Sequence, residues 1–277
     1  MQHPRFNYVK TLMQANQPVL LEGAAGTGKT SIIMQAAESL NLPFFSITGT
    51  QQTSVSNLLG FSTVTGDYSK SQLRQAYEFG GVFLIEEIDA MGPNTLICLN
   101  SIENGFLSFP DRVVNAHPDF RLCATANPSD QHATFTGRSK LDAATLDRYL
   151  NVRVDRAAAL EEHLTSADAV KLATSARDWL VSNGVTTSTV TMRDTIRYHK
   201  LTGLRDAGLI SDDPLIALVK VHDSTMHSDL TAIRTSMALS KTPITEATCL
   251  SELMAIVRAI QSTGGLNATN TKTDIYF

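Results

Sequence analysis

The sequence contains few of the features that mark secreted, membrane or nucleic-acid-binding proteins. Three of its 277 residues are cysteines, and Cys98, Cys123 and Cys249 show neither C-x-x-C spacing nor a cluster with histidine, which argues against a disulfide framework or a zinc site. A formal charge of −4 supplies no general attraction to nucleic acid or to an anionic membrane. No apolar run is long enough for a membrane span or a signal peptide. We therefore expect a soluble, cytoplasmic globular protein.

The most informative segment is residues 23–30, whose sequence GAAGTGKT fits the phosphate-binding loop pattern G-x-x-x-x-G-K-[ST]. Residues 18–21 before it are apolar and predict a buried strand, and residues 31–40 after it predict a helix. Glycines let backbone amides approach a ligand, and a helix N-terminus attracts an anion. We expect Lys29 to reach the β- and γ-phosphates and Thr30 to bind Mg²⁺. The residues expected to contact the nucleotide are Gly23, Ala24, Gly26, Thr27, Gly28, Lys29, Thr30 and Ser31.

Strand-like and helix-like segments alternate in the first half of the chain, which is typical of a parallel sheet covered by helices. A long polar stretch, residues 48–69, interrupts this alternation, and connections of that length tend to be functional. Residues 106–114 predict a small hairpin. The remaining expected strands are residues 43–47, 82–85, 120–125 and 151–154, and the expected helices are residues 72–79, a helix opening at Pro93, and residues 141–149.

From about Arg156 onward the helical period dominates, and no strong strand signal interrupts it. The expected helices there are residues 168–180, 193–204, 214–230 and 245–263. The chain is thus predicted to have an α/β fold, with a P-loop parallel sheet covered by helices and then a small all-helical lid. The predicted boundaries give a nucleotide-binding domain at residues 1–155, the lid at residues 156–265, and a C-terminal tail at residues 266–277.

Polar residues follow two of the expected strands, and the carboxyl ends of parallel strands share the sheet edge at which ligands bind. Glu86 is expected to support Mg²⁺, through water, and Glu87 to polarise the attacking water. Asn127 is placed to hold that water beside the γ-phosphate. Asn127 and Pro128 together are also a common turn signal, and the two interpretations are compatible.

Three arginines are candidates for sensing the γ-phosphate. Arg148 belongs to the short helix before the last strand, where it can reach a nucleotide bound to a neighbouring subunit, as an arginine finger does. Arg138 is a second candidate for that role. Arg193 begins a later helix and can contact the γ-phosphate and report its loss. At each position, an ordinary solvated arginine is the alternative.

Taken in this order, the motifs resemble those of an AAA+ ATPase of the MoxR type, and they are most similar to the CobS-like and CbbQ-like branches, some of which are carried by bacteriophages. Residues 80–89, GGVFLIEEID, resemble the Walker B segment of that group. The resemblance to that group continues in residues 99–105, 116–128 and 137–149. One departure is Glu86, where the family usually has Asp; the longer side chain shifts the carboxylate by about one methylene.

The resemblance implies ATP as the nucleotide, Mg²⁺ as its metal, and a ring, usually a hexamer, that remodels or activates a protein partner. That partner often carries a von Willebrand factor A domain. The inserts at residues 51–68 and 106–114 are implied to face the ring pore. The implied roles are Walker A for Lys29 and Thr30, Walker B for Glu86 and Glu87, sensor 1 for Asn127, the trans arginine finger for Arg148 and sensor 2 for Arg193.

Two functions from different classes stay open. The first is this ATP-hydrolysing ring protein, located in the cytoplasm, or in the host cytoplasm if a phage encodes it. The alternative is a nucleotide-gated structural or packaging component that acts on nucleic acid or on a viral particle, with a restriction-type motor as a third option. The alternative needs a basic pore surface, and the inserts and the segment between them contain only Lys70, Arg74 and Arg112 as basic candidates.

Overall fold

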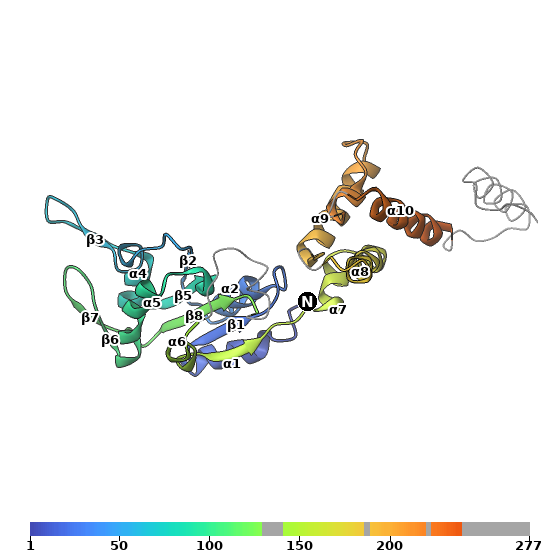
Figure 1. The fold of residues 1–277 in the computed structure, drawn as a ribbon. Coiled ribbons are helices and arrows are strands. Elements are labelled where there is room, and N and C mark those ends of the chain that lie inside the picture. Colours follow the sequence, from blue (N-terminus) through green and yellow to red (C-terminus); the bar gives the residue numbers. More distant parts are fainter. Residues whose placement is uncertain (129–140, 186–188, 220–222, 240–277) are drawn as a thin grey trace, which may run out of the picture. The chain divides into compact units, whose positions relative to one another are not determined.

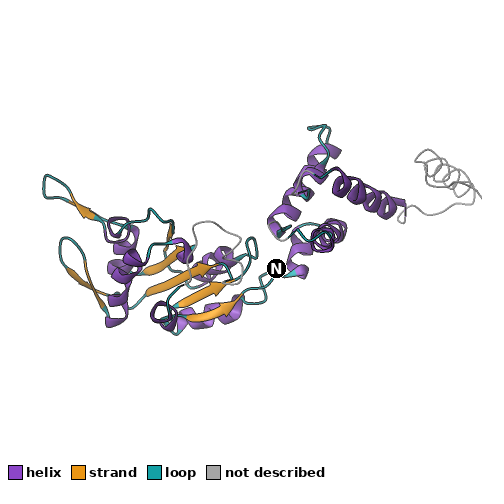
Figure 2. Ribbon diagram, in the orientation of Figure 1, coloured by secondary structure: helices purple, strands orange, loops and turns teal. Residues whose placement is uncertain are grey.

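A parallel five-stranded sheet organises the first part of the chain in the computed structural model, which describes residues 1–128, 141–185, 189–219 and 223–239 (Figures 1 and 2). The strand order is β2-β5-β8-β1-β9. The strands are β1 (Val19–Glu22), β2 (Phe44–Thr48), β5 (Gly81–Glu86), β8 (Phe120–Ala126) and β9 (Leu150–Arg153). The three central strands are almost continuously apolar because both faces of the sheet are covered. The predicted fold class is confirmed.

Each face of the sheet contributes to a separate hydrophobic core, because successive strand residues point to opposite sides. Val19 and Leu21 pack in the core that includes helices α1 (Phe6–Gln14) and α2 (Lys29–Ser39). Leu20 packs in the other core, with α4 (Gln72–Phe79) and α5 (Pro93–Ile97). The 3-10 helix η2 (Cys98–Asn104) continues the segment after α5, so the helix predicted from Pro93 tightens partway along its length.

Two small antiparallel hairpins project from the same end of the sheet (Figure 1). The first hairpin, β3–β4 (Phe61–Ser62 and Tyr68–Ser69), forms within the long polar stretch, after helix α3 (Val55–Leu59). The second, β6–β7 (Phe106–Ser108 and Val113–Asn115), is the hairpin that the sequence predicts. The first hairpin was not predicted, because each of its strands contains only two residues.

Helices follow the sheet, as predicted. They are α7 (Ala158–Leu164), α8 (Ala167–Ser182), α9 (Met192–Asp206), the 3-10 helix η4 (Pro214–Ala217) and α10 (Ser224–Leu239). The single helix predicted at residues 214–230 is wrong, because η4 and α10 are separate elements. The Asp223 carboxylate accepts the backbone N–H groups of Thr225 and Met226 and so caps a new helix start. The predicted helix at residues 245–263 and the tail at 266–277 lie outside the described residues.

The chain divides into two compact units, residues 1–230 and residues 231–277. The predicted domain boundary after residue 155 stays a prediction. Among the helices that the structure describes, none combines the length and the apolar character that a membrane crossing requires.

A buried carboxylate, Glu161, connects three of the helices. Its fully buried side chain in α7 accepts hydrogen bonds from Arg177 Nη2 at 2.7 Å, from Arg156 Nη1 at 3.1 Å and from the Thr195 hydroxyl. Arg177 belongs to α8, and its Nε also donates to the Val190 carbonyl at 2.7 Å. The network therefore holds the first turn of α9 against α7 and α8.

We expect Glu161→Ala to lower the free energy of unfolding by about 3–5 kcal/mol, because it leaves the Arg177 charge in a mostly buried site without its carboxylate. The matched control is Glu162→Ala at the exposed neighbouring position, with an expected change within about 0.5 kcal/mol. Urea unfolding of both variants measures the difference. Equal effects of the two substitutions would contradict the assigned role of Glu161.

Candidate functional site

The strand order gathers the predicted site residues at one edge of the sheet. Strand β8 lies between β5 and β1, with Ile85 aligned with Ala124 and Glu22 aligned with Ala126. All three strands are parallel, so their carboxyl ends meet at this edge. The phosphate loop that follows β1, the acidic pair at the end of β5 and the amide that follows β8 therefore become neighbours.

Three glycines give the loop its shape. Gly26 and Gly28 have φ values of +75° and +93°, in the left-handed region that favours glycine. Gly28 is the N-cap of α2, so the loop leads directly into the N-terminus of that helix. Gly23 packs so closely that an added Cβ would lie 2.2 Å from the carbonyl oxygen of Val154. This loop brings backbone N–H groups and the positive end of a helix to one surface, which suits a phosphate.

The Lys29 side chain folds back over the loop. Its Nζ donates hydrogen bonds to the carbonyl of Gly23, to the carbonyl of Ala24 at 3.0 Å and to Asn127 Oδ1 at 3.4 Å. Asn127 is buried and directly follows β8. The ammonium group is thus held at the sheet edge by oxygen acceptors, within reach of both the loop and the predicted sensor.

Thr30 and Glu86 form the pair that suits a magnesium ion. The Thr30 hydroxyl donates to Glu86 Oε2 at 2.9 Å, which joins the first turn of α2 to the end of β5. Hydroxyl and carboxylate oxygens are hard ligands of the kind that Mg²⁺ takes, together with water and phosphate oxygens. These two residues therefore fit the predicted metal. The longer Glu86 side chain reaches the threonine hydroxyl directly, and its role at the metal stays a prediction.

Glu87 adopts an unusual backbone conformation. Its φ and ψ are +55° and +46°, a left-handed geometry that few residues with side chains adopt. Its N–H donates to the Thr125 hydroxyl at 3.1 Å, so strand β8 helps to hold the turn. The turn exposes the Glu87 side chain, whereas Glu86 is half-buried beside Thr30. Strain of this type, on the order of 1–3 kcal/mol, concentrates at functional positions.

Arg193 reaches this site from the helical part of the chain. It lies near the start of α9, whose N-cap Thr191 forms a capping box with Asp194. The loop and this helix start are close, since a Cβ added to Gly26 would lie 2.8 Å from Thr191 Cβ. Together they enclose a pocket of about 220 Å³. Its lining residues are Ala25, Gly26, Thr27, Gly28, Lys29, Thr30, Ser31, Glu86, Glu87, Thr125, Ala126, Asn127 and Arg193.

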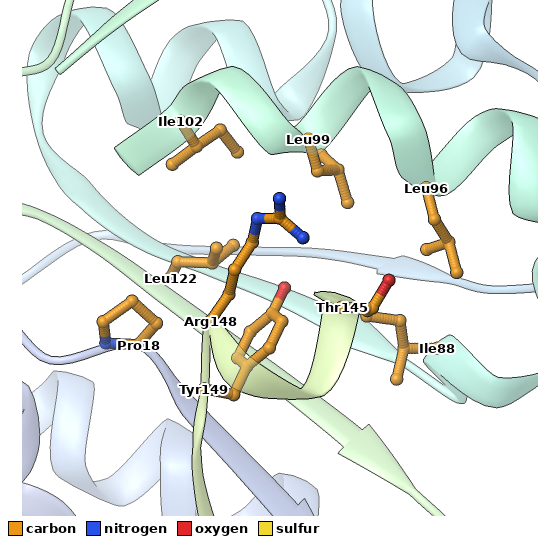
Figure 3. A pocket seen from close by; sticks show the side chains of 9 residues that line it. All are labelled: Pro18, Ile88, Leu96, Leu99, Ile102, Leu122, Thr145, Arg148 and Tyr149. Carbon is orange, nitrogen blue, oxygen red and sulfur yellow. The ribbon is translucent and has the colours of Figure 1, made fainter. Parts of the chain in front are cut away.

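Arg148 lies in a different place. It follows helix α6 (Ala143–Asp147), and its Nη1 donates to the carbonyl of Ala144. Its side chain lines a small pocket that is otherwise mostly apolar, with the guanidinium directed toward Leu99 and Tyr149 beside it (Figure 3). The structure thus does not bring Arg148 to the phosphate loop of its own chain. Arg138, the other candidate finger, lies outside the described residues.

Most of the predicted site residues come together in the 220 Å³ pocket, and Gly23 and Ala24 contribute by accepting from Lys29. Thr125 was not predicted as a site residue. A hydroxyl at the second-to-last position of a buried apolar strand was the available signal.

Most residues of this site lie in a segment that is similar to a known protein family. Residues 18–149 match the family model of the AAA domain (dynein-related subfamily). An uncharacterised protein of Staphylococcus saprophyticus is 30% identical over 162 residues, which cover 54% of this chain and 60% of that relative. An uncharacterised protein of Staphylococcus aureus strain USA300 is 25% identical, with the same coverage. The matched region therefore spans less than two thirds of these relatives.

The solved structure of NtrX from Brucella abortus is also similar to this chain. The TM-score is 0.51 at 14% identity, over 95% of this chain and 63% of that one. At this identity the likeness concerns the fold, and it agrees with the parallel sheet and flanking helices described above. The assignment to the MoxR-type branch and the phage origin stay predictions.

Proposed function

We propose that this chain is an AAA+ ATPase of the MoxR type, which binds ATP with Mg²⁺ at the 220 Å³ pocket and hydrolyses it. The observation that carries the proposal is the convergence of a phosphate loop, a hydroxyl–carboxylate pair, a second carboxylate and a buried amide at one sheet edge. A phosphate-binding loop alone is sufficient only to bind a nucleotide. The additional acidic and amide groups are those that hydrolysis requires.

The binding roles follow from the contacts. The loop N–H groups and Lys29 bind the phosphates, and Lys29 exchanges its hydrogen bonds with loop carbonyls for bonds to phosphate oxygens. Thr30 and Glu86 would hold Mg²⁺, which would neutralise charge on the phosphates. Arg193, near the start of α9, adds a positive charge to the lining of the pocket.

The hydrolytic roles belong to Glu87 and Asn127. Glu87 presents an exposed carboxylate at the pocket, where it orients the attacking water and accepts its proton. The Asn127 amide lies beside Lys29 and holds the same water in line with the γ-phosphate. Both side chains leave the sheet at neighbouring strands, so their spacing is fixed by the parallel register.

We further propose a ring of six subunits, the usual number in the family that the motifs resemble, in which Arg148 contacts the nucleotide bound to the adjacent subunit. Arg148 lies away from the phosphate loop of its own chain, which supports a role at the nucleotide of a neighbouring subunit. An arginine supplied in trans contributes about 10³-fold or more to the rate, so assembly and activity are expected to be coupled.

The partner is proposed to be a protein, with a von Willebrand factor A domain as the expected type. Three cations near the hairpins, which a nucleic-acid partner would need, are engaged with carboxylates. Lys70, Arg74 and Arg112 each form an ion pair with Glu78, and Arg74 forms a further one with Asp111. This pairing offers little free positive charge to phosphates. A salt titration of DNA and RNA binding tests the alternative, since phosphate contacts make affinity fall steeply with salt.

The proposed function is tested by nucleotide binding to Lys29→Ala. We expect the wild-type protein to bind ATP in the presence of Mg²⁺, and the variant to lose most of that affinity because the charged phosphate donor is gone. Lys171→Ala, which removes an exposed lysine on α8, is the matched control and should bind like the wild type. Calorimetric titration with and without EDTA measures both the affinity and the metal requirement. Equal affinity in the two variants would contradict the proposed site.

A further inference from the structure

A buried arginine lies between the two hairpins. The side chain of Arg74, on α4, is fully buried. Its Nη1 and Nη2 donate to the two carboxylate oxygens of Asp111 at 2.7 and 3.3 Å, and its Nε donates to Glu78 at 2.9 Å. Its guanidinium also lies over two aromatic rings, 4.6 Å from the centroid of Phe109 and 5.3 Å from that of Tyr68.

These contacts reach both hairpins at once. Tyr68 belongs to β4 of the first hairpin, and its hydroxyl donates to the carbonyl of Leu59. Phe109 and Asp111 lie in the turn of the second hairpin, between β6 and β7. The two hairpins form separate two-stranded sheets. A single two-stranded ribbon is marginally stable in water, so each hairpin depends on what packs against it.

We infer that Arg74 is a positioning residue that holds the β3–β4 and β6–β7 hairpins as one rigid body. This inference rests on the proposed function, since the inserts that contain these hairpins are implied to face the pore of the proposed ring. Helix α4 leads through Gly80 directly into β5, the strand that ends at Glu86. A shift of β5 at the nucleotide site would therefore move both hairpins together instead of either one alone.

Arginine is suited to this task by its shape. The planar guanidinium binds one carboxylate with two parallel hydrogen bonds, reaches a second carboxylate through Nε and stacks on aromatic rings. A lysine ammonium is a point charge and cannot make all these contacts together. The same contacts hold the pKa values of Asp111 and Glu78 below their usual range, through hydrogen bonds from Arg74.

The test is the distance between the hairpins, measured by pulsed electron paramagnetic resonance. Nitroxide labels are attached through Val64→Cys and Val113→Cys, at two exposed positions, one in each hairpin. The background carries Cys249→Ser. Burial raises the pKa of Cys98 to about 11 and that of Cys123 to about 12, so both thiols stay protonated and react slowly with the label.

We expect a narrow distance distribution in the parent protein and the loss of that narrow distribution in Arg74→Met. Arg112→Met, which removes an exposed arginine that also pairs with Glu78, is the matched control and should keep the narrow distribution. Replacing either hairpin label by a label at Gln35→Cys, exposed on α2, measures the distance from α2 to the other hairpin. The two measurements together identify which hairpin is released. Tyr68→Leu should free the first hairpin alone, and Asp111→Asn the second alone.

A narrow distribution in folded Arg74→Met would overturn the inference. If Arg74→Met does not fold, as judged by circular dichroism, Asp111→Asn provides the test, and an unchanged distribution in that variant would equally overturn it. The measurement needs neither nucleotide nor partner. Its outcome is therefore separate from that of the ATP-binding experiment on Lys29→Ala.

Discussion

Glu87→Gln is expected to bind ATP as tightly as the wild type and to lower turnover by about 10²- to 10⁴-fold, because it removes the proposed base while keeping the shape of the side chain. The Glu87 side chain is exposed and the substitution leaves the backbone hydrogen bond to Thr125 intact, so the fold is expected to be preserved. Phosphate release under saturating ATP and calorimetric binding measure the two quantities separately.

Glu38→Gln is the matched control for this variant, since Glu38 is exposed on α2 and lies away from the pocket lining. It should retain wild-type turnover. Full activity in Glu87→Gln would remove Glu87 from the hydrolytic role, and a parallel loss of ATP binding would assign it to binding instead.

Arg148→Ala is expected to retain ATP binding and to lose about 10³-fold in turnover, the loss typical of a missing arginine finger. The residue lies in the pocket beside Leu99 and Tyr149, away from the phosphate loop, so binding by the same subunit should not depend on it (Figure 3). Arg153→Ala, at an exposed arginine on the adjacent strand β9, is the control and should keep full turnover.

Mixing the inactive variants distinguishes action in trans from action in cis. Arg148→Ala subunits bind ATP but lack the finger, whereas Lys29→Ala subunits have the finger but lack the phosphate donor. A mixed ring places an intact finger beside an intact loop, so partial recovery of activity is expected. If the mixture stays inactive and Arg138→Ala also loses turnover, Arg138 is the finger. If the Arg148→Ala and Arg138→Ala variants are inactive only because they no longer bind ATP, the trans arrangement is contradicted.

The sheet and the loop were predictable because their signals are local. The central strands are buried on both faces, so their apolar runs stand out, and the glycines of residues 23–30 are required by local backbone geometry. The strand order then brings Glu86 and Asn127 to the loop, as expected for the carboxyl ends of parallel strands. The proximity of Thr30 to Glu86 follows from the same arrangement.

Features that depend on long-range packing were not predictable. The cluster around Arg74 joins α4 to two hairpins, and helix α4, strand β5 and helix α5 separate Tyr68 from Phe109 and Asp111 along the chain. The division of residues 214–230 into η4 and α10 depends on local capping by Asp223, which the helical period of the surrounding apolar residues obscures. Helix α1 was likewise missed, although Phe6, Val9 and Met13 follow a helical spacing.

The most direct test of the account is the turnover per subunit, measured together with the mass of the assembly, across a range of protein concentrations with ATP and Mg²⁺ present. We expect turnover per subunit to rise with protein concentration as single chains join into a ring, because each active site needs an arginine from its neighbour. A protein that stays a single chain, and turns over ATP at the same full rate at every concentration, would contradict it.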